Sequence, residues 1–426
     1  MKLLVVGGGG REHAIIRKLN ESPKVDKIYC APGNGGISRD AECVNIGACD
    51  IDNMVAFAKD NAIDFCVVAP DDPLAAGMVD AMNGAGIPCF GPNKAAARIE
   101  GSKVFAKNLM KKYGIPTAAY EVFDDPHAAM DYVKAQNTYP TVIKADGLAL
   151  GKGVILAQTE EEAMAAIHSI MEDKQFGDSG NQIVIEEFLT GPEVSVLSFC
   201  DGKTIVPMVS SMDHKRALDG DQGLNTGGMG TVAPNPHYTD AVAKECMETI
   251  FLPTVRAMEA EGCPFAGCLY FGLMLTPKGP KVIEYNCRFG DPETQVVLPL
   301  LKSDLLDIFV AVSQGKLDSV PVEFAKDEYA ACVVEASGGY PQNYEKGKVI
   351  QGLDENGQCH GVTVYHAGTK YENGQFLTSG GRVLGLTATA KTLPQALEKA
   401  YQAAETVTFE KMHLRKDIGQ RALQAL

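Results

Sequence analysis

Short apolar runs alternate with helix-like patterns through the first hundred residues, and no other feature constrains the fold as strongly. The runs, strand-like and helix-like in turn, are residues 3–6, 12–20, 27–30, 51–59, 65–69 and 74–85. Strands that alternate with helices form βαβ units, and these units build a parallel sheet. We therefore expect an α/β domain with a Rossmann-like sheet, which would hold ligands at the carboxyl ends of its strands.

The pattern changes near residue 100. A helix is expected at residues 103–113, and a smaller unit with strands, a glycine loop and a helix follows it. The last hundred residues are strand-rich and include one long amphipathic helix. We predict three domains, which are residues 1–102, residues 103–324 and residues 325–426, with a mobile subdomain at about 117–190 in the second.

Composition and charge exclude several classes of protein. No apolar run approaches the roughly 18 residues that a membrane span requires, and the apolar start runs directly into four glycines, unlike a signal peptide. The net charge of −15 argues against a general nucleic-acid binder. The 12 cysteines have no C-x-x-C spacing, as is typical of reduced thiols. We expect a cytoplasmic monomer that binds neither membranes nor nucleic acids.

Three polar residues, Glu284, Asn286 and Arg288, would share one face of a strand at residues 282–288. A carboxylate, an amide oxygen and a guanidinium in a row favour a site for a hard metal and an anion. A polar loop follows at residues 289–295, as expected of a catalytic floor. The alternative is an ordinary amphipathic strand with a solvated face.

Four glycines at residues 7–10 follow the first strand, but their spacing does not fit a dinucleotide site. The third glycine of the G-x-G-x-x-G pattern would fall on Glu12 or His13, and the second strand ends without an acid for a ribose. The free N–H groups of such a turn still suit a phosphate-bearing small molecule. Alternatively, these glycines only let the helix approach the sheet.

A second glycine loop, at residues 144–154, does not match the Walker A pattern. Because it joins two strands, we expect a flexible flap over nucleotide phosphates, with Lys144 beneath and backbone amides above. A plain surface hairpin is the alternative.

An apolar strand near residue 185 runs into Glu186 and Glu187. Such a hinge offers backbone groups to an adenine ring and a carboxylate to a ribose, although acidic strand ends are common. A long polar loop follows at residues 213–230, and its length is typical of functional or mobile segments. His214 has no second histidine at ligand spacing, so we expect it to donate or accept hydrogen bonds within the loop.

Taken in order, Lys103, Lys144, the glycine flap, the acidic hinge and the strand with Glu284 and Asn286 resemble the ATP-grasp ligases. Within that superfamily the chain is similar to the phosphoribosylamine–glycine ligase family almost from end to end. The motifs that carry this resemblance are residues 5–14, 31–34, 213–216, 225–230, 284–295, 366–369, 380–384 and 415–419.

The resemblance implies an ATP-grasp domain between the N-terminal parallel-sheet domain and a C-terminal strand-rich domain. It implies a purine-biosynthetic ligase that joins glycine to 5-phosphoribosylamine through glycyl phosphate, with ATP as co-substrate and Mg²⁺ or Mn²⁺ as the metal. The partners are then these three small molecules. Another ATP-grasp carboxylate–amine ligase, or a purine-pathway carboxylase, would alter residues 225–230. An oxidoreductase rests only on the N-terminal glycines, and a non-enzymatic nucleotide sensor also stays open.

The resemblance also implies roles for individual residues. Glu284 and Asn286 would bind the metal, Arg288 the acyl group and Asp213 the glycine ammonium, the last two as catalytic residues. The implied ATP-binding residues are Lys103, Lys144, Gly151, Lys152, Gly153, Glu186, Glu187, Leu189 and Glu193. The implied substrate-binding residues are Gly8, Gly9, Asn34, Asp72, Asn225, Thr226, Gly227 and Gly228.

Two positions depart from the pattern. The strand before Glu284, at residues 270–274, lacks the additional metal-binding carboxylate of other ATP-grasp proteins, so the metal would lean more on ATP oxygens and water. Asp71 stands where the family has a glutamate, and the shorter side chain reaches less far.

Overall fold

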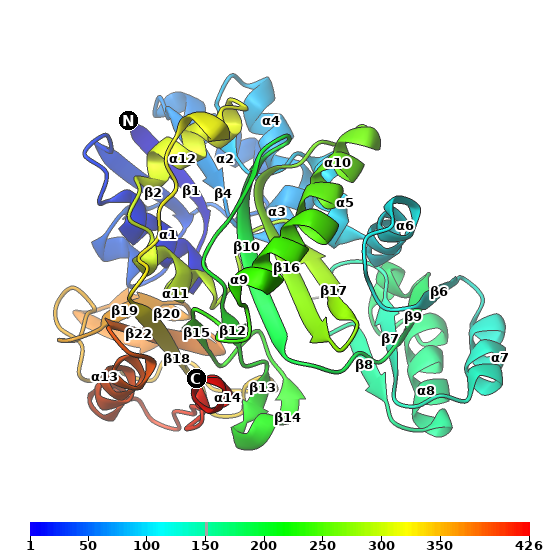
Figure 1. The fold of residues 1–426 in the computed structure, drawn as a ribbon. Helices are drawn as coiled ribbons and strands as arrows, with labels where there is room; N and C mark the ends of the chain where they lie inside the picture. The colour runs from blue at the N-terminus through cyan, green and yellow to red at the C-terminus, as the bar shows by residue number, and fades with distance from the viewer. Residues whose placement is uncertain (150–151) are drawn as a thin grey trace.

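The computed structural model describes residues 1–149 and 152–426, and it shows a broad body with one smaller unit projecting from its side (Figure 1). The body contains a parallel sheet and two antiparallel sheets, and the projecting unit has an antiparallel sheet of its own. None of the helices in the described ranges has the length and apolar character that crossing a membrane would need.

The N-terminal unit is the expected parallel sheet, with strand order β3-β2-β1-β4-β5. Its strands are β1 (Lys2–Gly7), β2 (Lys27–Pro32), β3 (Glu42–Cys43), β4 (Phe65–Val68) and β5 (Cys89–Phe90). Its helices are α1 (Gly10–Leu19), α2 (Ile51–Asp60), α3 (Asp71–Ala76), α4 (Met78–Gly84) and α5 (Lys94–Gly101). The central strand β1 is apolar throughout because its successive side chains enter two different cores, Leu4 and Val6 on one face and Leu3 and Val5 on the other.

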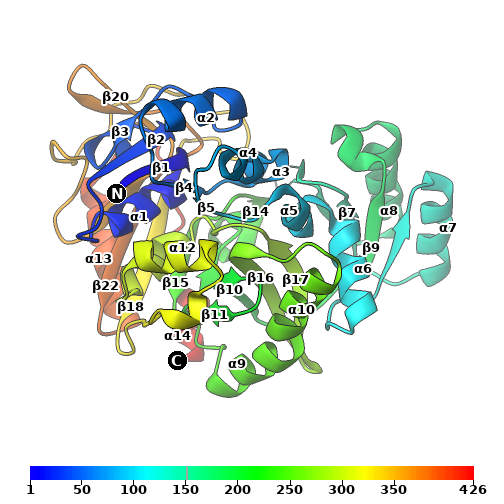
Figure 2. The same ribbon diagram turned by 90° about the horizontal axis from the view of Figure 1, so that it is seen from above.

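The projecting unit, which we call the lid, follows helix α6 (Lys103–Tyr113). Its strands are β6 (Tyr120–Phe123), β7 (Thr141–Ala145), β8 (Val154–Ala157) and β9 (Ile183–Glu187), and its helices are α7 (Pro126–Gln136) and α8 (Glu160–Ile167). The strand order is β6-β9-β7-β8, and a separate hydrophobic core fills the unit. Figure 2 shows the lid standing apart from the body, with α6 at its base.

The central sheet has the order β11-β10-β16-β17. Its strands are β10 (Glu193–Asp201), β11 (Ile205–Pro207), β16 (Ala266–Thr276) and β17 (Gly279–Asn286), which is the edge strand next to the lid. The helices of this part of the chain are α9 (Asp240–Cys246), α10 (Leu252–Ala260), α11 (Thr294–Val297) and α12 (Leu305–Ser313). β17 therefore lies where the body and the lid meet.

The last sheet has the order β12-β15-β18-β22-β19 and combines strands from two distant parts of the chain. Its members are β12 (Met212–Asp213), β15 (Gly230–Ala233), β18 (Tyr329–Ala336), β19 (Thr363–His366) and β22 (Arg382–Ala390). Helix α13 (Leu393–Thr406) packs on β18 and β22. Two hairpins, β13–β14 (Arg216–Leu218, Gln222–Asn225) and β20–β21 (Thr369–Glu372, Gln375–Thr378), and the last helix α14 (Gln420–Ala425) complete the described part. This sheet thus contains residues from both sides of position 325.

Candidate active site

β17 begins at Gly279, before the predicted range of 282–288, and it contains Glu284 and Asn286. It ends at Asn286, so Arg288 lies two residues beyond the strand. The cause is Glu100, whose Oε2 accepts the Cys287 N–H at 2.7 Å and takes the place of a strand partner. The expected alternation is nevertheless present: Tyr285 and Cys287 are buried, while the three polar side chains remain partly exposed. They form the centre of the candidate site.

Glu100, at the end of α5, fixes the orientation of Asn286. The Asn286 Nδ2 donates to Glu100 Oε1 at 3.1 Å and to the Tyr285 carbonyl at 3.0 Å. Both partners only accept hydrogen bonds, so the amide nitrogen must face them and the oxygen Oδ1 must face the other way. The arrangement therefore presents an oxygen from Asn286 toward the site.

The same carboxylate holds Arg288. The Arg288 nitrogen Nη2 lies 3.1 Å from Glu100 Oε1, and its Nη1 donates to the Phe289 carbonyl at 3.3 Å. Burial raises the pKa of the Glu100 carboxyl, and the neighbouring Arg288 opposes this shift. Sequence analysis missed Glu100, because a single acid at a helix end gives no local signal of this role.

Glu284 faces a group of cations. Lys215 Nζ lies 3.5 Å from Glu284 Oε1 and 3.9 Å from Glu193 Oε2. Burial alone would raise the pKa of the Glu284 carboxyl. The positive charges of Lys215, Lys144 and Lys103, in that order of size, outweigh burial and hold this pKa below its ordinary value. Glu284 is therefore an ionised carboxylate.

The residues present fit a divalent cation bound through few protein ligands. Ionised Glu284 and the Asn286 oxygen are hard oxygen donors, and Mg²⁺ usually keeps several waters and phosphate oxygens beside one or two protein ligands. Within residues 1–149 and 152–426, no three His, Cys, Asp or Glu side chains gather as a metal cluster. A metal here would accordingly depend on nucleotide oxygens and water.

Two of the predicted nucleotide-binding residues, Lys103 and Lys144, lie at the junction of α6, the lid and β17. Lys103 Nζ donates to the Gly147 carbonyl at the base of the flap at 2.7 Å, and Lys144 Nζ donates to the Ile283 carbonyl of β17 at 3.2 Å. Burial lowers the pKa of the Lys103 ammonium. The structure thus brings these lysines to the strand that carries Glu284.

Glu186, which the sequence predicts as an ATP-binding residue, has its carboxylate in the interior of this junction. Its side chain is 5% exposed, and Oε1 lies 3.1 Å from both Lys107 Nζ and Lys144 Nζ. Lys107, which sequence analysis missed, also donates to Thr117 Oγ1 at 2.7 Å. The Glu186 carboxylate therefore holds the two lysines in place.

The rest of the hinge is more open. Glu187 accepts the Ala119 N–H at 3.0 Å and lies 3.2 Å from Lys281 Nζ, so its carboxylate is engaged within the protein. Leu189 is partly exposed, and Glu193 is exposed at the start of β10. The Glu193 carboxylate, which faces Lys215, therefore remains accessible.

In the flap, Gly151 lies outside the described residues, and Lys152 is exposed. The Gly153 carbonyl accepts the Ala145 N–H at 2.8 Å, which pairs the base of the flap with β7. A Cβ on Gly153 would lie 2.7 Å from the Ala149 Cβ, so a larger residue does not fit there. Glycine at this position is required by packing.

The predicted phosphate loop is used largely within the protein. The Gly9 N–H donates to Glu12 Oε2 at 2.7 Å, and a Cβ on Gly8 would lie 2.5 Å from the Gly33 carbonyl oxygen. The Asn34 amide donates to the Gly8 carbonyl at 3.0 Å and the His366 carbonyl at 2.7 Å, and its oxygen accepts two backbone N–H groups. The Gly9 amide and the Asn34 side chain are therefore occupied, and these residues brace the loop.

Asp71 and Asp72 begin α3 but differ in their surroundings. Asp72 is exposed, and its N–H donates to Asp71 Oδ1 at 3.0 Å. Asp71 is partly buried. Burial is the largest effect on the pKa of the Arg288 guanidinium and lowers it, but the charges of Glu100 and then of Asp71 raise it, and the net shift is upward. Asp71 therefore lies nearer the central site than the predicted Asp72.

The loop at 213–230 places Asp213 beside the central acids. Burial, ahead of the charge on Glu293, raises the pKa of the Asp213 carboxyl well above its ordinary value. His214 is buried; its Nε2 accepts the Gly419 N–H at 3.1 Å, so Nδ1 carries the hydrogen and donates to the Gly230 carbonyl at 3.0 Å. The prediction that His214 serves as a hydrogen-bonding residue of the loop is confirmed.

A cleft of about 720 Å³ lies between the flap, this loop and a C-terminal segment. Its lining residues are Lys152, Asn225, Thr226, Gly227, Tyr340, Pro341, Gln342, Asn343 and Tyr344. The Gly227 N–H donates to the Tyr340 hydroxyl at 3.0 Å, and the Gly228 N–H donates to Thr226 Oγ1 at 3.0 Å. Arg382 NH1 donates to the Asp291 carbonyl at 2.8 Å. The C-terminal unit thus helps to form the site, which local sequence patterns did not indicate.

The chain matches three models of one family: the phosphoribosylglycinamide synthetase N domain at residues 1–100, its ATP-grasp (A) domain at residues 101–294 and its C domain at residues 330–421. It is 49% identical over 419 residues to the phosphoribosylamine--glycine ligase of Caldanaerobacter subterraneus subsp. tengcongensis, covering 98% of this chain and 99% of that protein. It is also 49% identical over 424 residues to the phosphoribosylamine--glycine ligase of Brucella melitensis biotype 1, covering 100% of this chain and 99% of that protein.

Solved structures give the same picture. The crystal structure of phosphoribosylamine--glycine ligase from Thermotoga maritima matches with a TM-score of 0.86 and 35% identity, covering 98% of this chain and 100% of that chain. The biotin carboxylase domain of 2-oxoglutarate carboxylase from Hydrogenobacter thermophilus matches with a TM-score of 0.74 at 15% identity, covering 97% of this chain and 91% of that chain, which is a likeness of fold alone. The α/β, ATP-grasp fold class expected from the sequence is confirmed.

Proposed function

The chain belongs to the phosphoribosylglycinamide synthetase family, and from that premise we propose that it joins glycine to 5-phosphoribosylamine while converting ATP to ADP and phosphate. The reaction is a step of purine biosynthesis. One observation carries the assignment of its centre: Glu284 stands where Lys215, Lys144, Lys103 and Arg288 converge, each lowering the pKa of its carboxyl. Such a group of cations around an oxygen-donor pair suits the anionic groups of ATP and a carboxylate substrate.

The chemistry explains why both kinds of group are present. A carboxylate is a poor electrophile, so a glycine carboxylate oxygen first attacks the γ-phosphorus of ATP, and ADP leaves. The ribosylamine nitrogen then attacks the carbonyl carbon of glycyl phosphate. Phosphate leaves and takes with it the glycine oxygen that had attacked the γ-phosphorus. Negative charge concentrates between the phosphates and the carboxylate in the first step, and Lys103, Lys144 and Arg288 are placed to stabilise it.

A divalent cation, Mg²⁺ or Mn²⁺, would be held by Glu284 and the outward-facing oxygen of Asn286. When bound, it neutralises charge on the phosphate oxygens. Glu100 keeps Asn286 and Arg288 in fixed orientations, so the metal ligand and the acyl-binding cation are set by the same carboxylate.

Asp213 is the proposed partner of the glycine ammonium group. Burial and the neighbouring Glu293 raise the pKa of its carboxyl, which means that the protein groups around Asp213 disfavour its charged form. A substrate ammonium supplies the missing positive charge and restores the ionised carboxylate. The cleft lined by residues 225–227 and 340–344 is proposed to take the phosphoribosyl group.

The lid, with its own core, is proposed to close over ATP and exclude water from glycyl phosphate. The lysine pair on Glu186 and the Lys144 contact to β17 are among the polar contacts at this junction. We propose that the protein acts as a monomer.

The test is ADP release by the purified protein, with glycine, 5-phosphoribosylamine or the metal omitted one at a time. We expect sustained release to require all three. ADP release that continues unchanged without glycine would contradict the assignment. Release that requires bicarbonate instead would favour a carboxylase, the alternative suggested by the related fold.

A further inference from the structure

The last segment of the chain, residues 413–421, clamps the loop that carries Asp213 and Lys215; we call it the C-terminal clamp. His413 Nε2 donates to the Ala217 carbonyl at 2.6 Å, and the Lys416 N–H donates to Asp219 Oδ1 at 2.8 Å. The Gly419 N–H donates to His214 Nε2, as described above. The clamp therefore contacts the first part of this loop repeatedly, from His214 to Asp219.

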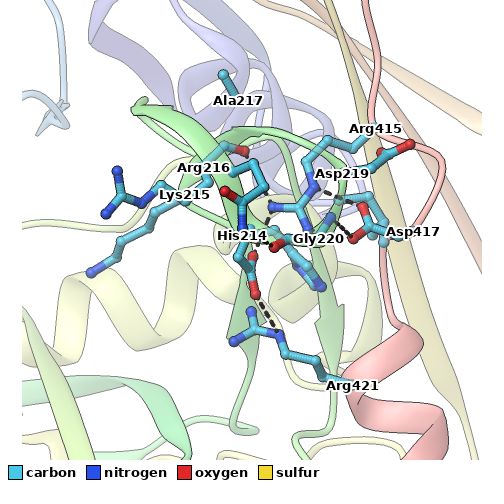
Figure 3. A network of polar contacts seen from close by, with 12 residues as sticks. His214, Lys215, Arg216, Ala217, Asp219, Gly220, Arg415, Asp417 and Arg421 are labelled. Atoms are coloured by element: carbon cyan, nitrogen blue, oxygen red, sulfur yellow. Dashed lines mark hydrogen bonds and ion pairs between the residues drawn. The ribbon is translucent and has the colours of Figure 1, made fainter.

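Arg415 is the centre of the clamp. It is 1% exposed and is among the largest fully buried side chains of the described residues. Nε and NH2 form a fork on the two oxygens of Asp417, each at 2.8 Å, and NH1 donates to Asp221 Oδ1 at 3.0 Å and to the Arg216 carbonyl at 3.2 Å. Figure 3 shows Arg415 beside Asp417.

Asp417, the carboxylate that accepts two Arg415 hydrogen bonds, also contacts the loop. Asp417 Oδ2 accepts the Gly220 N–H at 2.9 Å. Hydrogen bonds to Arg415 are the first cause of the low pKa of the Asp417 carboxyl, so the pair remains charged. Arg415 and Asp417 together hold the β13–β14 hairpin at both the Arg216 end and the Gly220 turn.

Arg415 contacts the residue that directly follows Lys215, which belongs to the central site. Arg216, whose carbonyl Arg415 holds, follows Lys215, and Lys215 extends away from the network in Figure 3. The Lys215 ammonium is the group that lies 3.5 Å from Glu284. On the other side of Lys215, Arg421 NH2 donates to the Asp213 carbonyl at 3.2 Å.

We propose that Arg415 is a positioning residue: its fork on Asp417 and its bond to the Arg216 carbonyl fix the backbone from which Asp213 and Lys215 reach the reacting groups. This inference rests on the proposed function, in which Asp213 binds glycine and Lys215 faces Glu284. Lys103 and Lys144, the proposed nucleotide-binding lysines, belong to α6 and β7. Within the described residues, their hydrogen bonds and ion pairs are to Gly147, Ile283 and Glu186 rather than to the clamp. Loss of Arg415 therefore disturbs the use of glycine before that of ATP.

The geometry requires arginine at this position. Lysine keeps the charge but has a single nitrogen, so it cannot span both Asp417 oxygens while also holding Asp221 and the Arg216 carbonyl. A catalytic group displaced by about 1 Å loses about a hundredfold in rate. Arg415→Lys should therefore lower turnover by about that factor and raise the KM for glycine by about tenfold, while the KM for ATP stays within about twofold.

The experiment measures steady-state kinetics for glycine and ATP in the wild type, Arg415→Lys, Asp221→Asn and the control Arg256→Lys, which changes an exposed arginine on α10. Amide hydrogen exchange at residues 216–225 and thermal melting are recorded on the same samples. Asp221→Asn removes the negative charge of one partner of Arg415 at a partly exposed position, so it decides the question if Arg415→Lys does not fold. Asp221→Asn should also raise the KM for glycine more than the KM for ATP, by a smaller factor than Arg415→Lys does. Arg256→Lys should match the wild type.

Three results would overturn the inference: wild-type kinetics in Arg415→Lys, an equal rise in KM for ATP and glycine, or a lower melting temperature with unchanged turnover per folded molecule. If Arg415→Lys does not fold, wild-type kinetics in Asp221→Asn would likewise overturn it. A wild-type protein without glycine-dependent ADP release contradicts the proposed function instead, so the two failures can be told apart.

Discussion

Replacing Lys107 by methionine should change how the stability of the protein depends on pH. Lys107 is 3% exposed and shares Glu186 with Lys144, and burial, only partly opposed by Glu186, lowers the pKa of its ammonium from 10.5 to about 8. At about 1.4 kcal/mol for each pH unit, the difference between these two values corresponds to about 3 kcal/mol. That is the cost of keeping this lysine charged in the folded state at neutral pH.

The sign follows from proton binding. Between pH 8 and 10.5 the unfolded chain keeps the Lys107 proton while the folded protein has released it, so unfolding takes up a proton and stability rises with pH in this window. The free energy of unfolding of the wild type, minus that of Lys107→Met, should therefore rise by up to about 3 kcal/mol from pH 8 to pH 10.5. Taking the difference cancels the titration of other groups.

Urea unfolding at closely spaced pH values measures this difference, and Lys111→Met, an exposed lysine on the same helix, is the matched control. The control difference should be flat. A flat difference for Lys107→Met as well, or one that grows as pH falls, would refute the argument that an incompletely compensated buried lysine stands at this junction.

Three further predictions concern the site and the core. Arg288→Ala should lower turnover by about a hundredfold and leave ATP affinity largely intact; near-normal turnover in a steady-state assay would remove Arg288 from the mechanism. Glu284→Ala should shift the metal titration of activity to much higher concentrations, and an unchanged titration would exclude metal ligation by Glu284. Glu335 is buried on β18 with no hydrogen-bond partner among the described residues, and burial raises the pKa of its carboxyl. Its neutral form is favoured in the folded state, so stability should fall as pH rises through the folded pKa, and Glu335→Gln should lose this dependence in urea unfolding.

Local patterns predicted much of the fold because the responsible interactions are local or repetitive. β1 is apolar on both faces, as a central parallel strand must be, and the two-residue period placed Glu284 and Asn286 on one partly exposed face. The pairing of the two strands that flank the glycine loop and the hydrogen-bonding role of His214 were likewise indicated by the local sequence.

Long-range contacts account for what the sequence did not predict. Glu100 ends β17 and orients Asn286 from 186 residues away in the chain, and no local pattern reports such a pair. Glu186 follows an ordinary strand, yet Lys107 and Lys144 enclose its carboxylate. The last sheet joins β12 and β15 to the C-terminal strands, which brings Tyr340 to the cleft.

The central claim is that ATP activates the glycine carboxylate. Glycine labelled with ¹⁸O in its carboxylate tests this directly, because the oxygen that attacks the γ-phosphorus stays with phosphate when the amine displaces it. We predict that each phosphate released carries one oxygen from glycine, as measured by mass spectrometry of the phosphate. Phosphate without label, formed together with glycinamide ribonucleotide, would contradict the account.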